Sequence, residues 1–549
     1  MTRTSVLAGD TRSRGLFRGR RSRPVAAARY TAAGLVLVLL LLFQVWGLAV
    51  GALLLVVVFG ATADTGTGGS IWQWAAGKRR WSHRVRAGFT DFIPVQHRPA
   101  DLTPTVAGGT RAERRAAVRV WNAYRDWPDG VDGLYWLESR PGLPAVAYHA
   151  GAGEGPYLSA AFRVDGPIQG LHGDAFVNRA QEAFGQLLAG WGPAAKLVSG
   201  IQVLTRVIPA DSALHEMWLQ DQLDPDAPQD LQADYTGLLG ELAGSSFVQR
   251  HYVVLVWDAD EQFHAHARRQ APGPDGWLWL VNGEIEAASR RLVDAQYQRV
   301  RPLTGPQLAA VLRHLQHPDW PIDRASDVTV ADCWFPSHDE RTHTQVTAEY
   351  PDPMDPDWLL PASTWLHRTA QIPVDALEVR EVDGLWLTPL LTGLAEQIVR
   401  TIAVHIRFTP AREAKATARR DVTTDQRDIL ARERKGQLVD DDTELALSSS
   451  ARRMSDLREG VGHHGAHWAA FLTVSARTPT DLSSACAHLE AAAADDAGIN
   501  RLDWLDTIQA AAQATTWPLG RGMTTPPRSV LTRAMRRVGA ATSTEAVTG

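Results

Sequence analysis

Histidine and cysteine residues at metal-ligand spacing are the first candidates for chemistry in this chain of 549 residues. His463, His464 and His467 form a close group, and a spacing of three or four residues can place two imidazoles on one helical face. A zinc site would need further ligands, and no cysteine or second histidine pair accompanies the group. A strand is also predicted to begin at Trp468, directly after it. A polar loop is the favoured interpretation, and we expect no bound metal.

Loops that would bind nucleotides are also missing. No GxxxxGK[ST] motif occurs, and the Gly-Lys pair at 77–78 is followed by Arg79 instead of the serine or threonine that holds magnesium. The glycines of GAGEGP (151–156) are wrongly spaced for a dinucleotide loop, and they precede a predicted strand, not a helix. The His-Glu pair at 215–216 lacks a second histidine, and no GxSxG motif is present. We therefore predict no catalytic residue, no cofactor and no ATP hydrolysis by this chain alone.

Twenty tryptophans raise the question of stacking on nucleic acid bases or sugars. Trp218, Trp257, Trp279 and Trp468 fall within apolar stretches, however. Large aromatic side chains in such stretches usually pack between elements. We expect these four to lie in the core.

The elements that must position any site begin with an apolar run from Thr31 to Ala63, in which Gln44 is the only strongly polar side chain. One helix of this length would extend roughly 50 Å, against a hydrocarbon core of about 30 Å. The run is therefore either one long tilted helix or two short spans that turn near Gln44, Trp46 and Gly47. Arginines precede it, and Lys78 and several arginines follow it, so both flanks have the basic character of the cytoplasmic side. This favours a transmembrane hairpin, and the later basic cluster argues against a cleaved signal peptide.

The juxtamembrane segment Ile71–Pro94 has aromatic residues at helical intervals and arginines mostly on other faces. This pattern is typical of a helix that lies in the membrane interface. Trp74, Trp81, Arg84 and Phe89 are the candidate membrane-interface residues. The alternative is an ordinary amphipathic helix that packs on the soluble part of the chain.

Beyond residue 100 the sequence alternates between strand and helix patterns, of which Val248–Trp257 is the strongest strand. This alternation predicts an α/β fold of mixed sheets covered by helices, preceded by the transmembrane hairpin. A Pro- and Asp-rich stretch at Tyr350–Pro361 indicates a boundary or an exposed excursion, and a charged helical pair is predicted between Ala411 and Gly460. The predicted organisation is a basic cytoplasmic leader (1–30), the transmembrane segment (31–63), a juxtamembrane interfacial segment (64–100), a first α/β domain (101–349), a second α/β domain with the charged helical excursion (350–520) and a flexible tail (521–549).

Composition limits the partners and the compartment. The formal net charge of −5 does not fit a general polyanion binder. The basic residues are concentrated near the N-terminus. For that leader, contact with anionic lipid is favoured over contact with nucleic acid. The two cysteines, Cys333 and Cys486, lie far apart in sequence and build no disulfide framework, which fits a reducing compartment.

The order of these features resembles a family of membrane-anchored proteins from actinobacterial conjugative elements, which are associated with type IV secretion-like DNA transfer. The closest likeness lies in IAVHIRF (402–408), HWAAFLTVSARTPTDLSSACAHLEAAA (467–493) and GINRLDWLDTIQAAAQATTWPLGRG (498–522). The last two stretches also resemble the domain that precedes the motor in conjugative secretion ATPases. There, a similar Gln-to-Pro-Leu-Gly sequence leads into the motor, whereas here the chain stops soon after Pro518-Leu519-Gly520.

The resemblance implies a structural subunit of the cell membrane whose soluble part faces the cytoplasm, and it carries over no catalytic residues. Its implied partners are the lipid bilayer, a separate conjugative secretion ATPase and other membrane subunits, with self-association as a further option. Direct contact with nucleic acid stays open. Two alternatives remain: a membrane component of a type VII secretion complex, and a membrane-bound enzyme with an unrecognised site.

Overall fold

The protein is represented by a computed structural model that describes most of residues 71–523 and a few residues before them. Before residue 71, the described residues are 5–7, 31–32, 35–36, 50–51, 55 and 58. Within 71–523 the gaps are 105–108, 138–141, 152–154, 169–171, 194–195, 210–218, 220–227, 246, 324, 352–358, 379, 383, 393, 395–397, 410, 435–440 and 458–464.

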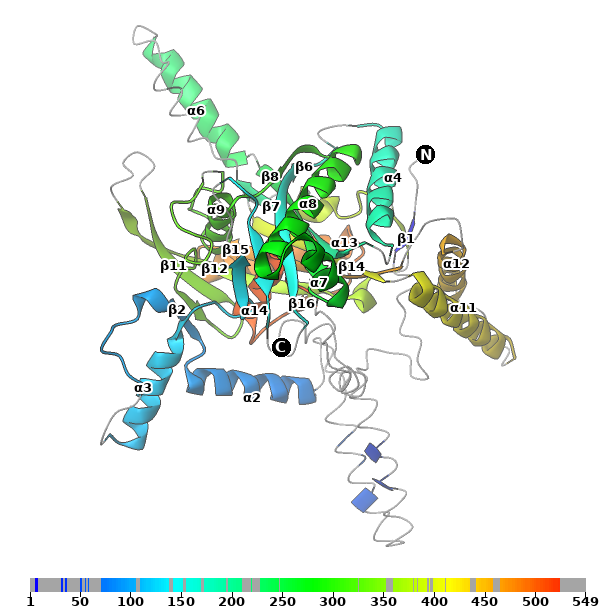
Figure 1. The fold of residues 1–549 in the computed structure, drawn as a ribbon, viewed down its shortest axis with the longest axis horizontal. Coiled ribbons are helices and arrows are strands. Elements are labelled where there is room, and N and C mark those ends of the chain that lie inside the picture. Colours follow the sequence, from blue (N-terminus) through cyan, green and yellow to red (C-terminus); the bar gives the residue numbers. More distant parts are fainter. Residues whose placement is uncertain are drawn as a thin grey trace.

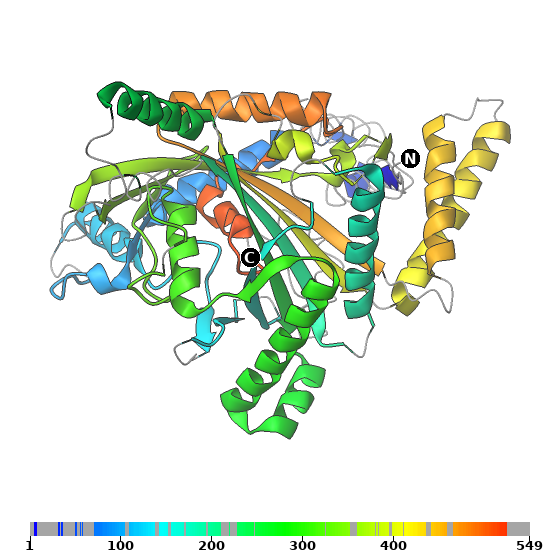
Figure 2. The same cartoon turned by 90° about the horizontal axis from the view of Figure 1, so that it is seen from above.

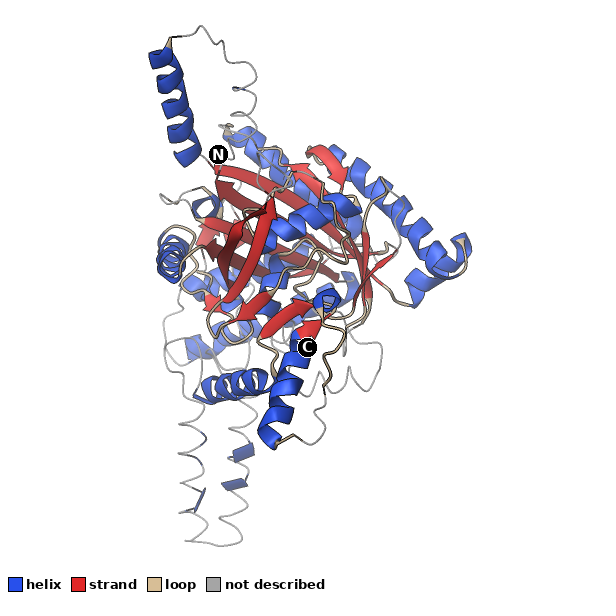
Figure 3. Cartoon of the chain, turned by 90° about the vertical axis from the view of Figure 1, so that its left-hand side faces the viewer, coloured by secondary structure: helices blue, strands red, loops and turns tan. Residues whose placement is uncertain are grey.

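A fourteen-stranded mixed sheet forms the centre of the described structure (Figure 1, Figure 3). Its neighbouring strands pair antiparallel, except that β2 and β3 pair parallel. In spatial order the strands are β3 (Tyr124–Arg125), β2 (Asp91–Pro94), β10 (Ser337–Asp339), β11 (Thr344–Pro351), β12 (Leu359–Ile372), β15 (Gly465–Ala476), β14 (Val399–Thr409), β7 (Val198–Pro209), β8 (Phe247–Asp258), β6 (Tyr157–Asp165), β5 (Val146–His149) and β4 (Leu134–Leu137), with β16 (Asp503–Trp504) beside β12 and β9 (Gln298–Pro302) beside β6.

Two layers of covering elements bury the two faces of this sheet. Alternate residues of a strand point to opposite faces. In β6, for example, Leu158 and Phe162 join one hydrophobic cluster and Ala161 joins another. The first face is covered by α4 (Asp174–Trp191), α7 (Glu261–Gln270), α8 (Gly273–Asp294) and α13 (Pro479–Asp495), and the second by α9 (Gly305–Gln316), α14 (Gln509–Gln513) and the 3-10 turn η3 (Ala514–Thr516).

Several helices extend from this body. Figure 1 shows α6 (Gln229–Ser245) at one end of the molecule, and α2 (Ile71–Ala87) with α3 (Arg111–Ala123) at the opposite end. Figure 2 shows the pair α11 (Ala411–Arg434) and α12 (Asp441–Asp456) standing beside the body. The remaining described elements are β1 (Ser5–Leu7), which pairs with β13 (Arg380–Val382), the short α10 (Thr388–Leu391), and the 3-10 turns η1 (Val95–His97) and η2 (Val374–Ala376).

The α/β class predicted from the sequence is confirmed. The pattern at Val248–Trp257 corresponds to β8, and the charged helical pair corresponds to α11 and α12. The stretch after residue 110 is the helix α3, and Thr110 and Glu113 form a reciprocal capping box at its start. The predicted membrane run lies mostly outside the described residues, and no described helix is long and apolar enough to cross a bilayer.

The Pro- and Asp-rich stretch at Tyr350–Pro361 lies at a connection between neighbouring strands. β11 and β12 pair antiparallel on either side of it, with Tyr350 opposite Leu360. Strands from both sides of this position share the sheet, since β14 pairs with β7 and β15 pairs with β12. The division into domains at residue 350 stays a prediction, and the hydrogen-bonded sheet crosses it.

A row of polar side chains runs across the second face of the sheet. In the strand register, Arg206 of β7 lies opposite Thr401 of β14, which lies opposite Thr473 of β15, which lies opposite Thr369 of β12. All four are buried. The Arg206 guanidinium donates to the Thr401 hydroxyl at 2.8 Å, and the Thr369 and Thr473 hydroxyls are 2.8 Å apart. Buried polar groups need such partners, so this face cannot be covered by apolar side chains alone.

Residues 509–523, which we call the C-terminal strap, cover this polar face. Residues 511–520 are all buried. Gln202 of β7 is the main attachment: its amide nitrogen donates to the carbonyls of Thr515 and Trp517 at 3.2 and 2.9 Å, and its amide oxygen accepts from the Gly520 N–H at 2.8 Å. One side chain therefore satisfies three buried backbone groups of the strap.

Replacing Gln202 with leucine should destabilise the protein by on the order of 3 kcal/mol, because three buried backbone groups would lose their partner. Urea unfolding of the full chain in detergent, followed by tryptophan fluorescence, measures this change. Gln298→Leu on the exposed surface of β9 is the matched control, for which we expect a change within about 0.5 kcal/mol. Equal unfolding midpoints for the two variants would contradict the role of Gln202.

Candidate functional site

The motifs first considered for chemistry do not assemble a reactive centre among the described residues. His467 is exposed on β15, while His463 and His464 lie outside the described residues, as do His215 and Glu216. The described part of the chain holds no group of three or more metal-ligating side chains. The glycines at 151 and 155 lie in the connection between β5 and β6, and the Gly-Lys pair at 77–78 lies on α2.

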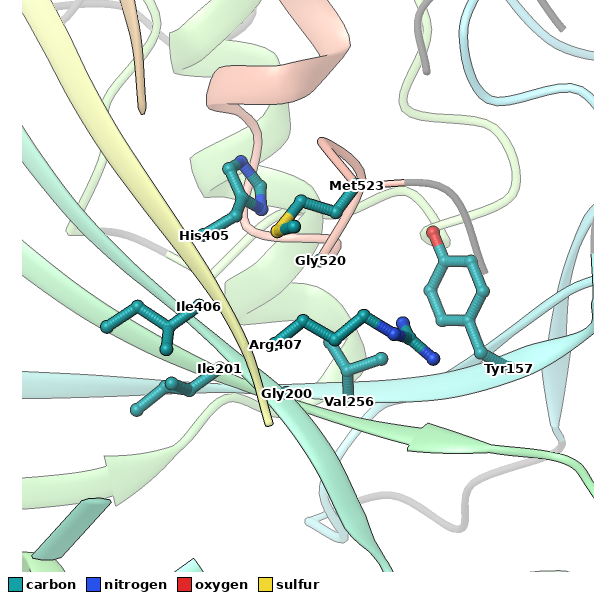
Figure 4. A pocket seen from close by; sticks show the side chains of 9 residues that line it. All are labelled: Tyr157, Gly200, Ile201, Val256, His405, Ile406, Arg407, Gly520 and Met523. Atoms are coloured by element: carbon teal, nitrogen blue, oxygen red, sulfur yellow. The ribbon is translucent and has the colours of Figure 1, made fainter. Parts of the chain in front are cut away.

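A pocket lies where the C-terminal strap meets β14 (Figure 4). It encloses about 290 Å³, including the space open to solvent. Figure 4 shows the Arg407 side chain extended towards Tyr157, and Met523 beside His405. Its described lining is Tyr157, Gly200, Ile201, Val256, His405, Ile406, Arg407, Gly520 and Met523.

Two polar side chains of this pocket, those of Arg407 and His405, are already engaged. Arg407 pairs with Asp258 of β8. The Nε2 atom of His405 lies 2.8 Å from the carbonyl oxygen of Thr515, which can only accept, so that nitrogen carries the proton. Burial lowers the pKa of His405 to about 4, although the bond to Thr515 opposes this shift, and the ring is neutral at pH 7. The residues around this pocket therefore help to hold the C-terminal strap against the sheet. Its described lining residues include no pair of a base and a nucleophile.

The most highly charged buried site is the joint between α2 and the body. Arg84 of α2 reaches two carboxylates: its Nη2 atom lies 2.5 Å from Oδ2 of Asp129 and 2.8 Å from Oδ2 of Asp339. The same nitrogen donates to the carbonyl of Phe89 at 3.0 Å. Arg125 of β3 binds the other oxygen of Asp129 at 2.6 Å. We call Arg84, Arg125, Asp129 and Asp339 the juxtamembrane joint.

The burial of this joint shifts the pKa values of the charged groups in and beside it. Burial lowers the pKa of Arg84, but Asp129 and Asp339 raise it by more, so the guanidinium stays charged. Burial raises the pKa of the Asp339 carboxyl to about 6, although Arg84 opposes this shift. Burial and the neighbouring Asp129 also raise the pKa of Asp132. Removing Arg84 would leave Asp339 buried without its cation, whereas Asp129 would keep Arg125.

The C-terminal strap also holds the joint. The backbone N–H of Ala510 donates to Oδ1 of Asp339 at 3.3 Å, and the Arg521 side chain donates to the Gly130 carbonyl at 2.7 Å. Gly130 has φ +90°, and an added Cβ would lie 2.6 Å from the carbonyl oxygen of Ala511. Only glycine allows this close approach of the strap to the turn that contains Asp129.

The packing of α2 against α3 is equally close. The amide of Asn122 in α3 donates to the carbonyl of Ala87 at 2.7 Å. Gly88, which follows α2, has φ +79°, and an added Cβ would lie 2.6 Å from the Cα atom of Arg119. The two helices are thereby fixed to each other as well as to the body.

The four residues predicted at the membrane interface lie on or next to α2. Arg84 is directed at the carboxylates of the joint, and Trp81 and Phe89 are half-buried. Arg125 stacks over the Phe89 ring at 5.6 Å. Trp74 is part of α2, and its side chain lies outside the described part of the structure. A membrane role for these residues stays a prediction, and helix packing on the body, the alternative interpretation, accounts for the contacts of Arg84 and Phe89.

The prediction that tryptophans pack in the core is correct for Trp257, which is fully buried, and Trp468 packs against the cluster beneath α13. It is wrong for Trp279, which is 70% exposed on α8. Trp277 and Leu280 pack towards the body on that turn of the helix, and the Trp279 side chain faces solvent. Trp218 lies outside the described residues.

Sequence reasoning selected Arg84 but missed its partners. Asp129 and Asp339 lie 45 and 255 residues further along the chain. The sequence around each of them is typical of an ordinary turn or strand, and their spacing matches no known motif. Comparison with known proteins adds no further assignment, because no family model matches the chain and no curated protein matches it.

Replacing Arg84 with alanine should destabilise the protein by about 3–5 kcal/mol, because it leaves two buried carboxylates without their shared cation. Arg86→Ala is the matched control: Arg86 is exposed on the same helix and donates a hydrogen bond to the Ser82 carbonyl one turn earlier. Urea unfolding of both full-length variants in detergent provides the comparison. If the Arg84 variant unfolds at the same urea concentration as the control, the joint does not stabilise the fold.

The Asp339 carboxyl also predicts a pH dependence. Its pKa is higher in the folded protein, about 6, than the ordinary value of 3.8, so the folded state keeps a proton that the unfolded state loses. Its contribution to stability is therefore complete below about pH 4 and is lost as the pH rises through about 6, by on the order of 3 kcal/mol. The free energy of unfolding of the wild type and of Asp339→Asn, measured by urea unfolding across this pH range, tests this prediction. Parallel profiles for the two proteins would contradict the assignment.

Proposed function

We propose that this chain is a membrane-anchored structural subunit of a conjugative, type IV secretion-like DNA-transfer apparatus, with its body in the cytoplasm. Its task would be to hold a separate secretion ATPase and other subunits at the membrane. The observation that carries this proposal is the juxtamembrane joint. The helix that directly follows the apolar run Thr31–Ala63 is bound to the body through Arg84, Asp129 and Asp339.

Two described residues inside the apolar run support a hairpin. Val36 and Gly51 are both helical, and a Cβ added to Gly51 would lie 2.8 Å from Cγ1 of Val36. In one straight helix, fifteen residues would separate them by about 22 Å. Their proximity supports the predicted turn near Gln44, Trp46 and Gly47, between these two positions.

A firm joint matters for an anchored scaffold. Anchoring confines the body to a thin layer at the bilayer and raises its effective concentration for other anchored subunits. A body attached through Arg84 also keeps one orientation relative to α2. The charged pair α11 and α12 and the distant α6 then provide surfaces that point away from α2 (Figure 1). The proposal assigns the docking of partners to such surfaces.

The hairpin predicts that both ends of the chain lie in the cytoplasm. In intact cells, a membrane-impermeant maleimide should fail to label Ser22→Cys and Ser543→Cys, and should label both after lysis. The native Cys333 and Cys486 are buried and give little background. Labelling of only one end in intact cells would indicate a single span and contradict the hairpin.

The test of function is affinity purification of a C-terminally tagged chain from gently solubilised membranes of cells that carry the element. We expect a P-loop secretion ATPase and further conjugation subunits to co-purify. An untagged strain is the control. Recovery of the chain alone, under conditions that preserve a known membrane complex, would overturn the proposal, and recovery of type VII secretion components would favour that system instead.

A further inference from the structure

The exposed faces of α2 and α3 form a strongly basic surface. α2 has five basic residues and no acidic residue, and α3 has four basic residues and one acidic residue. Arg84 faces the joint, but the other arginines on these helices are exposed. We call six of them the basic platform: Arg79 and Arg86 of α2, and Arg111, Arg114, Arg115 and Arg119 of α3.

The arginines of α3 lie on one face of the helix. Positions 111, 115 and 119 follow each other at intervals of four, and position 114 lies between them on the same side. Val118 shares this face and is 42% exposed. In the described structure, no carboxylate forms an ion pair with any arginine of the basic platform. Arginines beside an exposed aliphatic side chain are also found on helices that lie on membrane surfaces.

The platform is also rigid. Asn122 and the close approach at Gly88 fix α3 to α2, and Arg84 fixes α2 to the body. Arg98 stacks on Trp121 of α3 with its guanidinium 4.4 Å from the ring centre. A partner would therefore meet positive charges that are already in place, with little ordering of the backbone.

Position in the chain indicates what this surface faces. Val58, a helical residue of the apolar run, is separated from Ile71 at the start of α2 by residues 59–70. Even fully extended, a chain of this length spans at most roughly 45 Å. If the run is inserted in a bilayer, α2 and α3 lie close to its surface. The platform is also at the end of the molecule opposite α6 (Figure 1).

We propose that the basic platform binds the head groups of anionic phospholipids in the cytoplasmic leaflet, so that α2 and α3 dock flat on the membrane beside the anchor. This rests on the proposed membrane anchor. Arginine guanidinium groups bind phosphate oxygens through paired hydrogen bonds, and Val118 reaches the boundary of the acyl chains. Docking would add a second attachment and set the tilt of the body over the membrane.

A fluorescent label at the platform tests this. The full chain carrying Val118→Cys is labelled with a polarity-sensitive dye and reconstituted into vesicles of phosphatidylcholine alone or mixed with phosphatidylglycerol. We expect emission to rise only in vesicles that contain phosphatidylglycerol, and high salt to reverse the rise, because the attraction between exposed charges is screened. The same label at Val293→Cys, exposed on α8, should respond to neither lipid.

Charge reversal provides the matched comparison. Arg114→Glu with Arg115→Glu should raise the amount of phosphatidylglycerol needed for half the response by about ten-fold or more, since each cation near a membrane contributes substantially. The control pair, Arg268→Glu with Arg269→Glu, lies on an exposed part of α7 and should leave the response unchanged. Equal emission in both kinds of vesicle, or equal effects of the two pairs, would overturn the proposal.

Two further measurements separate the possible failures. Flotation of the chain with phosphatidylcholine vesicles in high salt reports the anchor alone. A chain that floats without a label response retains the anchor and refutes the platform, whereas a chain that does not float refutes the anchor. A label response to a single-stranded oligonucleotide, without one to phosphatidylglycerol, would assign the platform to nucleic acid and overturn lipid binding.

Discussion

The described body depends on one requirement: polar side chains that are buried on a sheet face must find hydrogen-bond partners. Gln202, Arg206, Thr401 and Thr473 point to the second face of the sheet, where water is excluded. The C-terminal strap supplies backbone carbonyls and N–H groups, and its own hydroxyl at Thr516 lies 2.8 Å from that of Thr473. An apolar helix in the same place would leave the Gln202 amide unsatisfied, at a large cost in stability. The polar row therefore selects the strap as its cover.

The strap also links the sheet to the end of the body that carries α2. Its beginning contacts Asp339 through the Ala510 N–H, and its end contacts Gly130 through Arg521. The carboxylates beside these contacts bind Arg84 of α2. Sheet, strap and α2 thus form a continuous series of buried polar contacts. Such a series would suit the scaffold role proposed above, because it couples the orientation of α2 to that of the whole body.

Much of the fold could be predicted from local patterns. A run rich in β-branched residues identified the long central strand β8, and the charged pattern between Ala411 and Gly460 identified the helical pair α11 and α12. The joint could be predicted only in part, since Arg84 stood out in an Arg-rich helix but was assigned to the membrane interface. An amphipathic helix has the same sequence pattern whether it packs on lipid or on protein. Its orientation depends on what the rest of the chain places beside it, and Asp339 is 255 residues away.

The sequence by itself determined the class of fold, the basic character of α2 and α3, and the position of the apolar run before them, because these follow from composition and short-range periodicity. Tertiary structure decided which strands are neighbours, which arginine turns inward, and which face of the sheet the strap covers. These depend on pairings such as Arg206 with Thr401 and Gln202 with Gly520, which join residues 195 and 318 positions apart. No local pattern encodes such pairings, because each partner is an ordinary polar residue until the fold removes it from water.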